Sequence, residues 1–162
     1  MTGLFEGNSE HYQVLRYKPP DQFYKSHSDF IANQIEQNCG PRLFTFFLYL
    51  QDVKSGMGGE TFFPNAQSLA EPDRKPCTNG QHGITFAEEV DCGLLVPPRK
   101  RSAVLWPNVD LNHFGRQNRN TMHAALAIKE ECADTATCVK WAANVWIHAF
   151  DFKGAHGKGL TG

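Results

Sequence analysis

The feature that most restricts the fold of this chain is a series of short apolar runs, each bounded by turn-forming residues. The runs are rich in aromatic and β-branched residues and are separated by clusters of Gly, Pro, Asn and Asp. Strands of this length and composition are typical of an all-β sandwich or barrel, so we expect a mainly β fold. The runs that predict strands are QVLRY (13–17), LFTFFLYL (43–50), TFF (61–63), GLLV (93–96), SAVLW (102–106), HAALAI (123–128) and WAANVWIHAF (141–150).

The segments between these runs predict one domain with a helix and two less regular parts. At 162 residues the chain is long enough to bury about two thirds of its unfolded surface around a single core. A helix is expected from residues 28–29 to Asn38, where Gly40 and Pro41 end it. The polar, turn-rich stretch 65–90 is expected to be a long mobile loop, and the Gly-rich stretch 153–162 a flexible tail. The core of the domain should therefore span about residues 10–152.

Charge and hydropathy argue against several classes of partner. The formal net charge is −1, and the one basic cluster, 99–101, has the length of a solvated turn, so nucleic acid is not expected. The apolar run 43–50 is far shorter than a membrane span. The start, MTGLFEGNSEH, lacks the charged and apolar regions of a secretion signal. A cytoplasmic protein and a catalytic core within a longer precursor both agree with this start.

The cysteine count leaves the redox state of the chain open. Five cysteines are an odd number for a pure disulfide framework, and none has the C-x-x-C spacing of a zinc site. Cys132 and Cys138 flank a short segment and could close a small loop in an oxidising compartment. A set of reduced thiols agrees equally well with the sequence.

Three residues have the chemistry of an iron site. His27 and Asp29 are two residues apart, and on an extended strand such side chains point to the same face. A distant histidine returned by the fold would complete two imidazoles and one carboxylate, a facial triad that suits non-haem Fe(II). His123, which opens an apolar run, is the predicted third ligand, and His113, in a polar stretch, is its competitor. The remaining histidines, expected to be structural or solvated, are His11, His82, His148 and His156.

The order of the motifs around these residues resembles the catalytic domain of the plant, algal and collagen-type prolyl 4-hydroxylases, which are Fe(II)- and 2-oxoglutarate-dependent dioxygenases. The similarity runs from about Glu10 to Phe152, nearly the whole chain. It rests on the order and spacing of QVLRY, QFYKSHSDF, RLFTFFLYL, GGETFFP, VPPRKRSAVLW, MHAA and KWAANVWIH. This resemblance implies a double-stranded β-helix, a jelly-roll variant, with one or a few flanking helices.

The same resemblance implies an activity. The expected reaction is hydroxylation of peptidyl proline to 4-hydroxyproline, with release of succinate and carbon dioxide. Fe(II), 2-oxoglutarate as cosubstrate and ascorbate are the expected cofactors, and the partner is an extended, proline-containing peptide. If the chain is a fragment, the family's usual compartment is the endoplasmic reticulum and secretory pathway. Two alternatives stay open: the same iron chemistry on another side chain or small molecule, and a metal-free binding module on the same barrel.

The resemblance also assigns roles to residues outside the metal site. The far carboxylate of 2-oxoglutarate needs a cation and hydroxyl groups inside the barrel, because a buried charge must be paired. Lys140 is the predicted cation, with Lys129 as its rival. The residues assigned by family position or strand face are Tyr17, Thr61 and Tyr49 for the cosubstrate and Arg42 and Tyr24 for the substrate.

Two departures from the family pattern concern the turns. Seventeen residues separate His123 from Lys140, a longer connection than is usual in the family, which a hairpin loop absorbs at modest entropic cost. Arg101 and Asp21 stand where the family has turn glycines. Both departures bear on turn shape and leave the predicted metal ligands in place.

Overall fold

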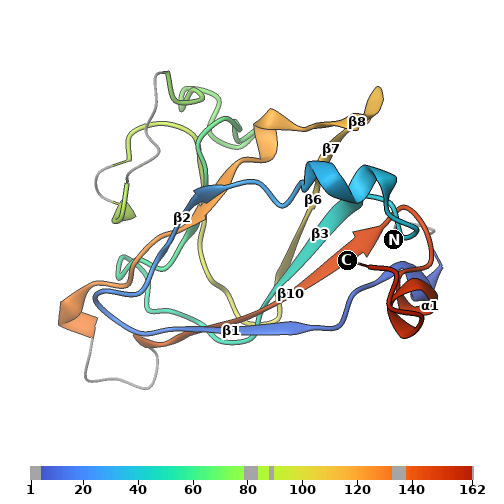
Figure 1. Cartoon of the computed structure of the whole chain (residues 1–162). Coiled ribbons are helices and arrows are strands. Elements are labelled where there is room, and N and C mark those ends of the chain that lie inside the picture. Colours follow the sequence, from blue (N-terminus) through green and yellow to red (C-terminus); the bar gives the residue numbers. More distant parts are fainter. Residues whose placement is uncertain (1–4, 79–83, 88–89, 133–137, 162) are drawn as a thin grey trace.

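Two antiparallel four-stranded sheets form the body of the protein (Figure 1). The structure, a computed structural model, describes residues 5–78, 84–87, 90–132 and 138–161. The first sheet has the order β1 (Gln13–Tyr17), β10 (Lys140–His148), β3 (Arg42–Tyr49) and β6 (Ala103–Pro107). The second has the order β2 (Tyr24–His27), β9 (His123–Ala125), β4 (Thr61–Phe63) and β5 (Leu94–Val96). A separate hairpin pairs β7 (Val109–Asp110) with β8 (His113–Gln117). The chain crosses repeatedly between the two sheets, which confirms the predicted jelly-roll fold.

Each of the seven predicted apolar runs contains a strand, and β3 shows the alternating burial that the pleat produces. In β3, Thr45, Phe47 and Tyr49 are buried while their neighbours along the strand are only partly covered. Phe47 and Tyr49 pack with Phe63 of β4 and Trp106 of β6 in one core cluster. Since these residues come from both sheets, the core lies between the sheets.

Two predictions about the helical parts are corrected. The helix expected over 28–38 is a short 3-10 helix, η2 (Ala32–Glu36), and none of its residues is buried, so packing does not support a longer one. The expected flexible tail instead contains α1 (Phe152–Gly157), where the Asp151 side chain accepts a 3.0 Å hydrogen bond from the Gly154 N–H. Phe152 also packs with buried Cys39.

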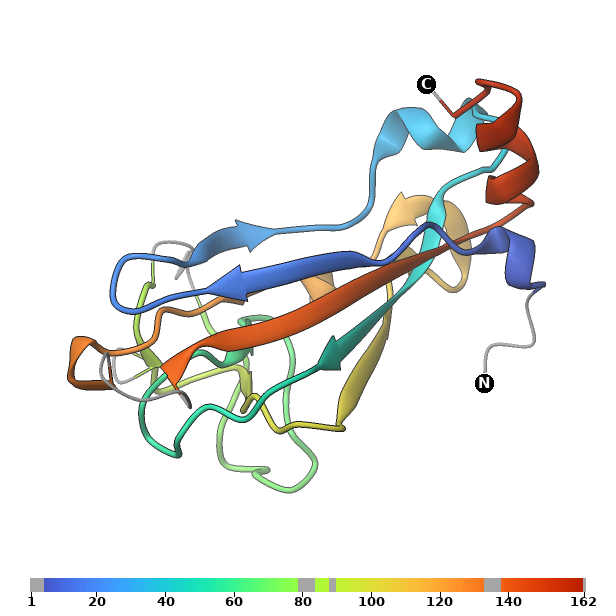
Figure 2. The ribbon, with the colours of Figure 1, turned by 90° about the horizontal axis from the view of Figure 1, so that it is seen from below.

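The ends of the described chain lie together at one end of the barrel. There α1 contacts the 3-10 helix η1 (Glu6–Asn8), while the long loops gather at the opposite end (Figure 2). Two more short 3-10 helices, η4 (Arg119–Thr121) and η5 (Glu130–Cys132), flank β9. Within the described ranges, no helix has both the length and the apolar character needed to cross a bilayer.

The described parts of the predicted loop 65–90 are attached to the barrel at several points. Cys77 forms a disulfide with Cys92, a pairing that the sequence did not predict. The Arg74 guanidinium donates hydrogen bonds to three main-chain carbonyls, those of Val90 at 2.9 Å, Cys92 at 3.3 Å and Gly93 at 2.9 Å. Residues 79–83 and 88–89 lie outside the described ranges, and the mobility of this loop stays a prediction.

The second disulfide answers the question that the sequence left open. Cys132 and Cys138 are bridged, so the alternative of five reduced thiols is wrong. Cys39 remains as a buried thiol. Residues 133–137 lie outside the described part of the chain.

The turn before β6 places Arg101 in a backbone conformation that glycine prefers. Its φ is 69°, a value that costs a residue with a Cβ about 1–2 kcal/mol. Glycine removes this strain but loses about 0.5–1 kcal/mol through the greater freedom of the unfolded chain. We therefore expect Arg101→Gly to raise the free energy of unfolding slightly, by about 0.5 kcal/mol, in a urea titration.

The matched control for this substitution is Arg99→Gly, two residues earlier in the same basic cluster. It removes the same charge at a residue that does not have a positive φ. We expect it to lower the free energy of unfolding. If both variants lose stability equally, Arg101 is not strained.

Candidate metal centre and the adjoining cavity

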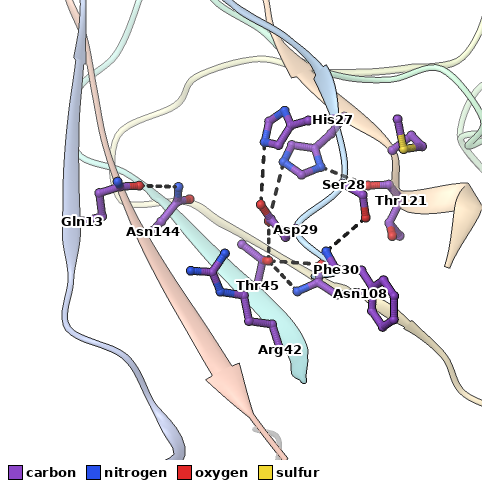
Figure 3. Close-up of polar contacts among 12 residues, drawn as sticks. Gln13, His27, Ser28, Asp29, Phe30, Arg42, Thr45, Asn108, Thr121 and Asn144 are labelled. Carbon is purple, nitrogen blue, oxygen red and sulfur yellow. Dashed lines mark hydrogen bonds and ion pairs between the residues drawn. The ribbon is translucent and has the colours of Figure 1, made fainter. Parts of the chain in front are cut away.

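His27, Asp29 and His123 meet on one side of the barrel interior. His27 closes β2 and His123 opens β9, and the two are direct partners in the antiparallel register. Nε2 of His27 lies 3.7 Å from Oδ1 of Asp29, and Nε2 of His123 lies 3.6 Å from Oδ2 (Figure 3). One possible ligand atom from each residue lies within 4.8 Å of the others. The fold therefore brings together the three residues predicted to bind a metal.

The second nitrogen of each imidazole fixes which atom is left for a cation. Nδ1 of His27 lies 2.9 Å from the carbonyl oxygen of Lys25, and Nδ1 of His123 lies 3.0 Å from that of Thr121. A carbonyl only accepts hydrogen bonds, so Nδ1 carries the proton in each neutral ring and Nε2 keeps its lone pair. Two lone pairs and a carboxylate then converge without a donor among them. This donor set fits Fe(II) with coordination positions left open.

The surroundings of the two histidines differ. Burial lowers the pKa of the His123 imidazole and outweighs the opposing effect of the Asp29 charge, which favours the neutral form that binds metals. The rings of Trp106 and Phe63 pack against His123, with centroids 4.7 and 5.7 Å away. The His27 side chain is 29% exposed, against 9% for His123. The centre is therefore closed behind His123 and open to solvent at His27.

Lys140, on β10 of the first sheet, is completely buried. Its Nζ lies 3.5 Å from Oγ1 of Thr61 and 5.5–5.7 Å from the centroids of three rings, those of Tyr17, Phe47 and Tyr49. Burial lowers the pKa of the Lys140 ammonium to about 7, against the opposing effect of the Glu60 charge. A buried ammonium with so long a polar contact is costly. An anionic group that reached it would offset that cost, and this fits the carboxylate predicted to bind there.

Hydroxyl groups lie beside this lysine, as predicted. The Tyr49 hydroxyl donates a 2.7 Å hydrogen bond to Oγ1 of Thr61, and burial raises the pKa of Tyr49, so the phenol stays protonated. Tyr17 and Thr61 line one cavity together with His27 and His123. The geometry thus connects the two histidines predicted to bind a metal to the surroundings of the buried lysine. The individual roles of these residues toward a cosubstrate stay predictions.

The two rival residues lie elsewhere. His113 is exposed at the start of β8, outside the cluster of three. Lys129 follows β9 and is half-buried, and its main-chain N–H donates a 2.9 Å hydrogen bond to the carbonyl of Met57. Neither side chain lines the cavity between the sheets.

The two residues assigned to the substrate differ in their surroundings. Tyr24 is half exposed at the mouth of the cavity, and its ring meets that of His27 edge-on with centroids 4.4 Å apart. Arg42 instead makes contacts within the protein: Nε donates to Glu10 at 2.6 Å, and the guanidinium lies 3.8 Å from the ring centroid of Trp146. Their roles toward a substrate stay predictions.

The other histidines lie apart from the centre where they are described. His148 is buried, with Nδ1 2.7 Å from the carbonyl of Gly40 and Nε2 2.8 Å from Glu10, which fits the predicted structural role. The rings of His11 and His156 meet edge-on with centroids 5.9 Å apart. His82 lies outside the described residues.

Sequence reasoning missed two residues behind the candidate metal centre, of which Thr45 contacts Asp29 and Asn108 contacts Thr45. Oγ1 of Thr45 donates to Oδ2 of Asp29 at 2.6 Å, and Nδ2 of Asn108 donates to Oγ1 of Thr45 at 2.9 Å. Thr45 shares a strand face with core residues, a weak signal that it points inward. Nothing in the sequence marks Asn108, which lies between β6 and β7.

A groove of about 730 Å³ opens beside the centre. Phe30, the residue after Asp29, forms one part of its wall, and the β7–β8 hairpin and η4 form another. Since η4 leads directly into His123, segments next to two of the three metal-binding residues border the groove. An extended chain lying in it would therefore pass close to the centre.

Comparison with known proteins gives a consistent result. A sequence profile of the 2OG-Fe(II) oxygenase superfamily matches residues 12–148. The chain is 31% identical over 141 residues to Prolyl 4-hydroxylase 1 of Arabidopsis thaliana, and the aligned region covers 86% of this chain and 41% of that protein. It is 30% identical over 151 residues to Prolyl 4-hydroxylase subunit alpha-2 of Gallus gallus, and the aligned region covers 91% of this chain and 21% of that protein. The chain thus spans less than half the length of these relatives.

A solved structure with the same fold extends this comparison. The viral collagen prolyl hydroxylase vCPH from Paramecium Bursaria Chlorella virus-1, in its 2OG complex, matches with a TM-score of 0.59 and 27% identity. The match covers 88% of this chain and 60% of that one.

Proposed function

Because this chain belongs to the 2OG-Fe(II) oxygenase superfamily, we propose that it uses Fe(II) and 2-oxoglutarate to hydroxylate peptidyl proline. One observation carries the proposal: two imidazole lone pairs and a carboxylate converge beside a cavity that leads to a buried lysine. We also propose that residues 10–152 are the catalytic core.

The mechanism assigns separate tasks to the two sides of the cavity. Bound iron with 2-oxoglutarate and dioxygen would supply the oxidant for a C–H bond: one oxygen atom enters the product hydroxyl, the other enters succinate, and carbon dioxide is released. His27 and His123 would hold the metal through Nε2, because the carbonyls of Lys25 and Thr121 keep the proton on Nδ1, and Asp29 would add a carboxylate oxygen. Lys140, assisted by hydroxyls such as that of Thr61, binds the far carboxylate of the cosubstrate.

The walls of the site support this division of tasks. The aromatic rings packed behind His123 exclude water from that side, while the exposed edge of His27, next to Tyr24, is the side on which the substrate approaches. A metal held by the three residues would therefore be reached from the side of His27 and Tyr24.

Proline in an extended peptide is the proposed substrate. The relatives named above are prolyl 4-hydroxylases, which supports this substrate class. A polyproline II segment has no internal hydrogen bonds and fits an open groove such as the one beside Phe30. Tyr24 and Arg42 are the proposed contacts to it, and ascorbate is the expected auxiliary reductant. The two disulfides favour an oxidising compartment, as in the secretory pathway.

The test is succinate formation by the purified protein with Fe(II), ascorbate, 2-oxoglutarate and a proline-rich peptide. We expect peptide-stimulated succinate and a mass gain of one oxygen atom on proline, both lost in His27→Ala and kept in His113→Ala. Succinate without a modified peptide would keep the iron chemistry and assign it to another substrate. A protein that binds neither metal nor 2-oxoglutarate would contradict the proposal and favour a binding module.

A further inference from the structure

A chain of buried hydrogen bonds ends on the carboxylate of Asp29. Nδ2 of Asn108 donates to Oγ1 of Thr45 at 2.9 Å, and Oγ1 of Thr45 lies 2.6 Å from Oδ2 of Asp29 (Figure 3). The exposed fractions of the three residues are 1%, 0% and 6% respectively. They come from three separate segments of the chain: the β6–β7 connection, the middle of β3 and the segment after β2.

The chemistry of the hydroxyl gives this chain a direction. Oγ1 of Thr45 has one proton and lies near two acceptors, Oδ2 of Asp29 at 2.6 Å and Oδ1 of Asn108 at 3.2 Å. The carboxylate is both closer and charged, so the proton goes to Asp29. A lone pair of the same oxygen then accepts from Nδ2 of Asn108. Asn108 thus orients the hydroxyl, and the hydroxyl orients the carboxylate.

The fold holds both donors in place without help from a metal. Thr45 lies in β3, between Trp146 of β10 and Trp106 of β6 in the sheet register. The Asn108 N–H donates to the carbonyl of Leu43 at 2.8 Å. Because these contacts are made by the main chain of the sheet, the position of the hydroxyl is fixed before a metal arrives.

We propose that Thr45 and Asn108 are positioning residues that fix the orientation of the Asp29 carboxylate toward the metal through the hydrogen bond to Oδ2. This inference rests on the proposed function. Oδ1 faces Nε2 of His27 at 3.7 Å and Oδ2 faces Nε2 of His123 at 3.6 Å, so both carboxylate oxygens lie beside the imidazole lone pairs. The hydrogen bond from Thr45 occupies one lone pair of Oδ2 and leaves the remaining lone pairs of the carboxylate for the metal.

The test measures metal binding in the absence of 2-oxoglutarate and oxygen, so it does not depend on turnover. Calorimetric titration of the metal-free protein with Mn²⁺ is expected to show affinity reduced about 10–100-fold in Thr45→Val. Thr45→Ser, which keeps the hydroxyl, is the matched control and is expected to bind like the wild type. Asn108→Leu, which keeps the volume and removes the donor, is expected to lie between the two.

Each outcome separates the inference from the function on which it rests. Thermal unfolding of each metal-free variant shows whether it is folded. The unfolding temperature relative to the wild type measures the effect of the substitution on stability alone. If folded Thr45→Val binds Mn²⁺ as tightly as the wild type, the positioning role is overturned and the proposed function stands. If the wild type itself binds no Mn²⁺, both are overturned. Weak binding in Thr45→Val with recovery in Thr45→Ser supports the inference.

Discussion

Asp29→Asn is expected to abolish metal binding and turnover while leaving the metal-free protein folded. The substitution removes the carboxylate charge from the cluster, and two neutral imidazoles bind a divalent cation poorly without it. The asparagine carbonyl keeps the shape of the side chain and can still accept the hydrogen bond from Thr45. The metal-free variant should therefore unfold at or above the wild-type temperature, because a buried carboxylate is costly.

Metal-induced stabilisation measures this effect without an activity assay. A metal at one hundred times its dissociation constant raises the free energy of unfolding by about 2.7 kcal/mol, and Asp29→Asn should lose this gain. His113→Ala is the control, because it removes an exposed imidazole that the structure places outside the cluster. If the metal-induced gain in stability persisted in Asp29→Asn and vanished in His113→Ala, the assignment of the metal site to His27, Asp29 and His123 would be wrong.

Lys140→Met is expected to remove 2-oxoglutarate binding and to stabilise the metal-free protein. Burial lowers the pKa of Lys140 to about 7 in the folded state, whereas the unfolded chain retains the ordinary value of about 10.5. Between these values the unfolded state binds the extra proton, so wild-type stability rises with pH in this window. The stability gained by the methionine variant should therefore be largest below pH 7 and should disappear as pH approaches 10.5. Its size is on the order of a few kcal/mol.

The same titration predicts how wild-type 2-oxoglutarate affinity depends on pH. A carboxylate binds the charged ammonium, so bound cosubstrate raises the pKa of Lys140 and affinity is fully present below pH 7. Above pH 7 it should fall by up to tenfold per unit. Among the described residues, the titratable groups that interact with Lys140 include Glu60, Tyr17, Tyr49 and His123. Burial raises the pKa of both phenols, which stay neutral in this range, and lowers the pKa of His123.

Calorimetry with Mn²⁺-loaded protein from pH 6 to 9 checks this dependence. Lys129→Met is the matched control, since it removes the same charge from the rival lysine, which is only half-buried, whereas Lys140 is completely buried beside Thr61. It should leave both the affinity and its pH dependence unchanged. A flat profile for the wild type, or loss of affinity only in Lys129→Met, would contradict the assignment of Lys140.

The parts of this site that could be predicted from sequence are those that local patterns encode. Short apolar runs specify strands, and a spacing of two residues keeps His27 and Asp29 close together, although β2 ends at His27 and Asp29 lies in the bend that follows. Asn108 could not be found in this way, because its contact depends on how β6 aligns with β3, a register that no local pattern encodes. The Cys77–Cys92 pairing and α1 also depend on distant contacts, the latter on Phe152 packing against Cys39.

The direct register of His27 with His123 has a mechanical consequence. β2 is the edge strand of its sheet and pairs with β9 at Tyr24 and Ala125 and again at His27 and His123, with an irregularity between. A metal bound by both histidines would bridge the two strands at their last pair and fasten the edge of the sheet. The ion would thus cross-link β2 to β9 in addition to its chemical role. The position of β2, which carries Tyr24 and His27 at the mouth of the cavity, would then depend on the bound metal.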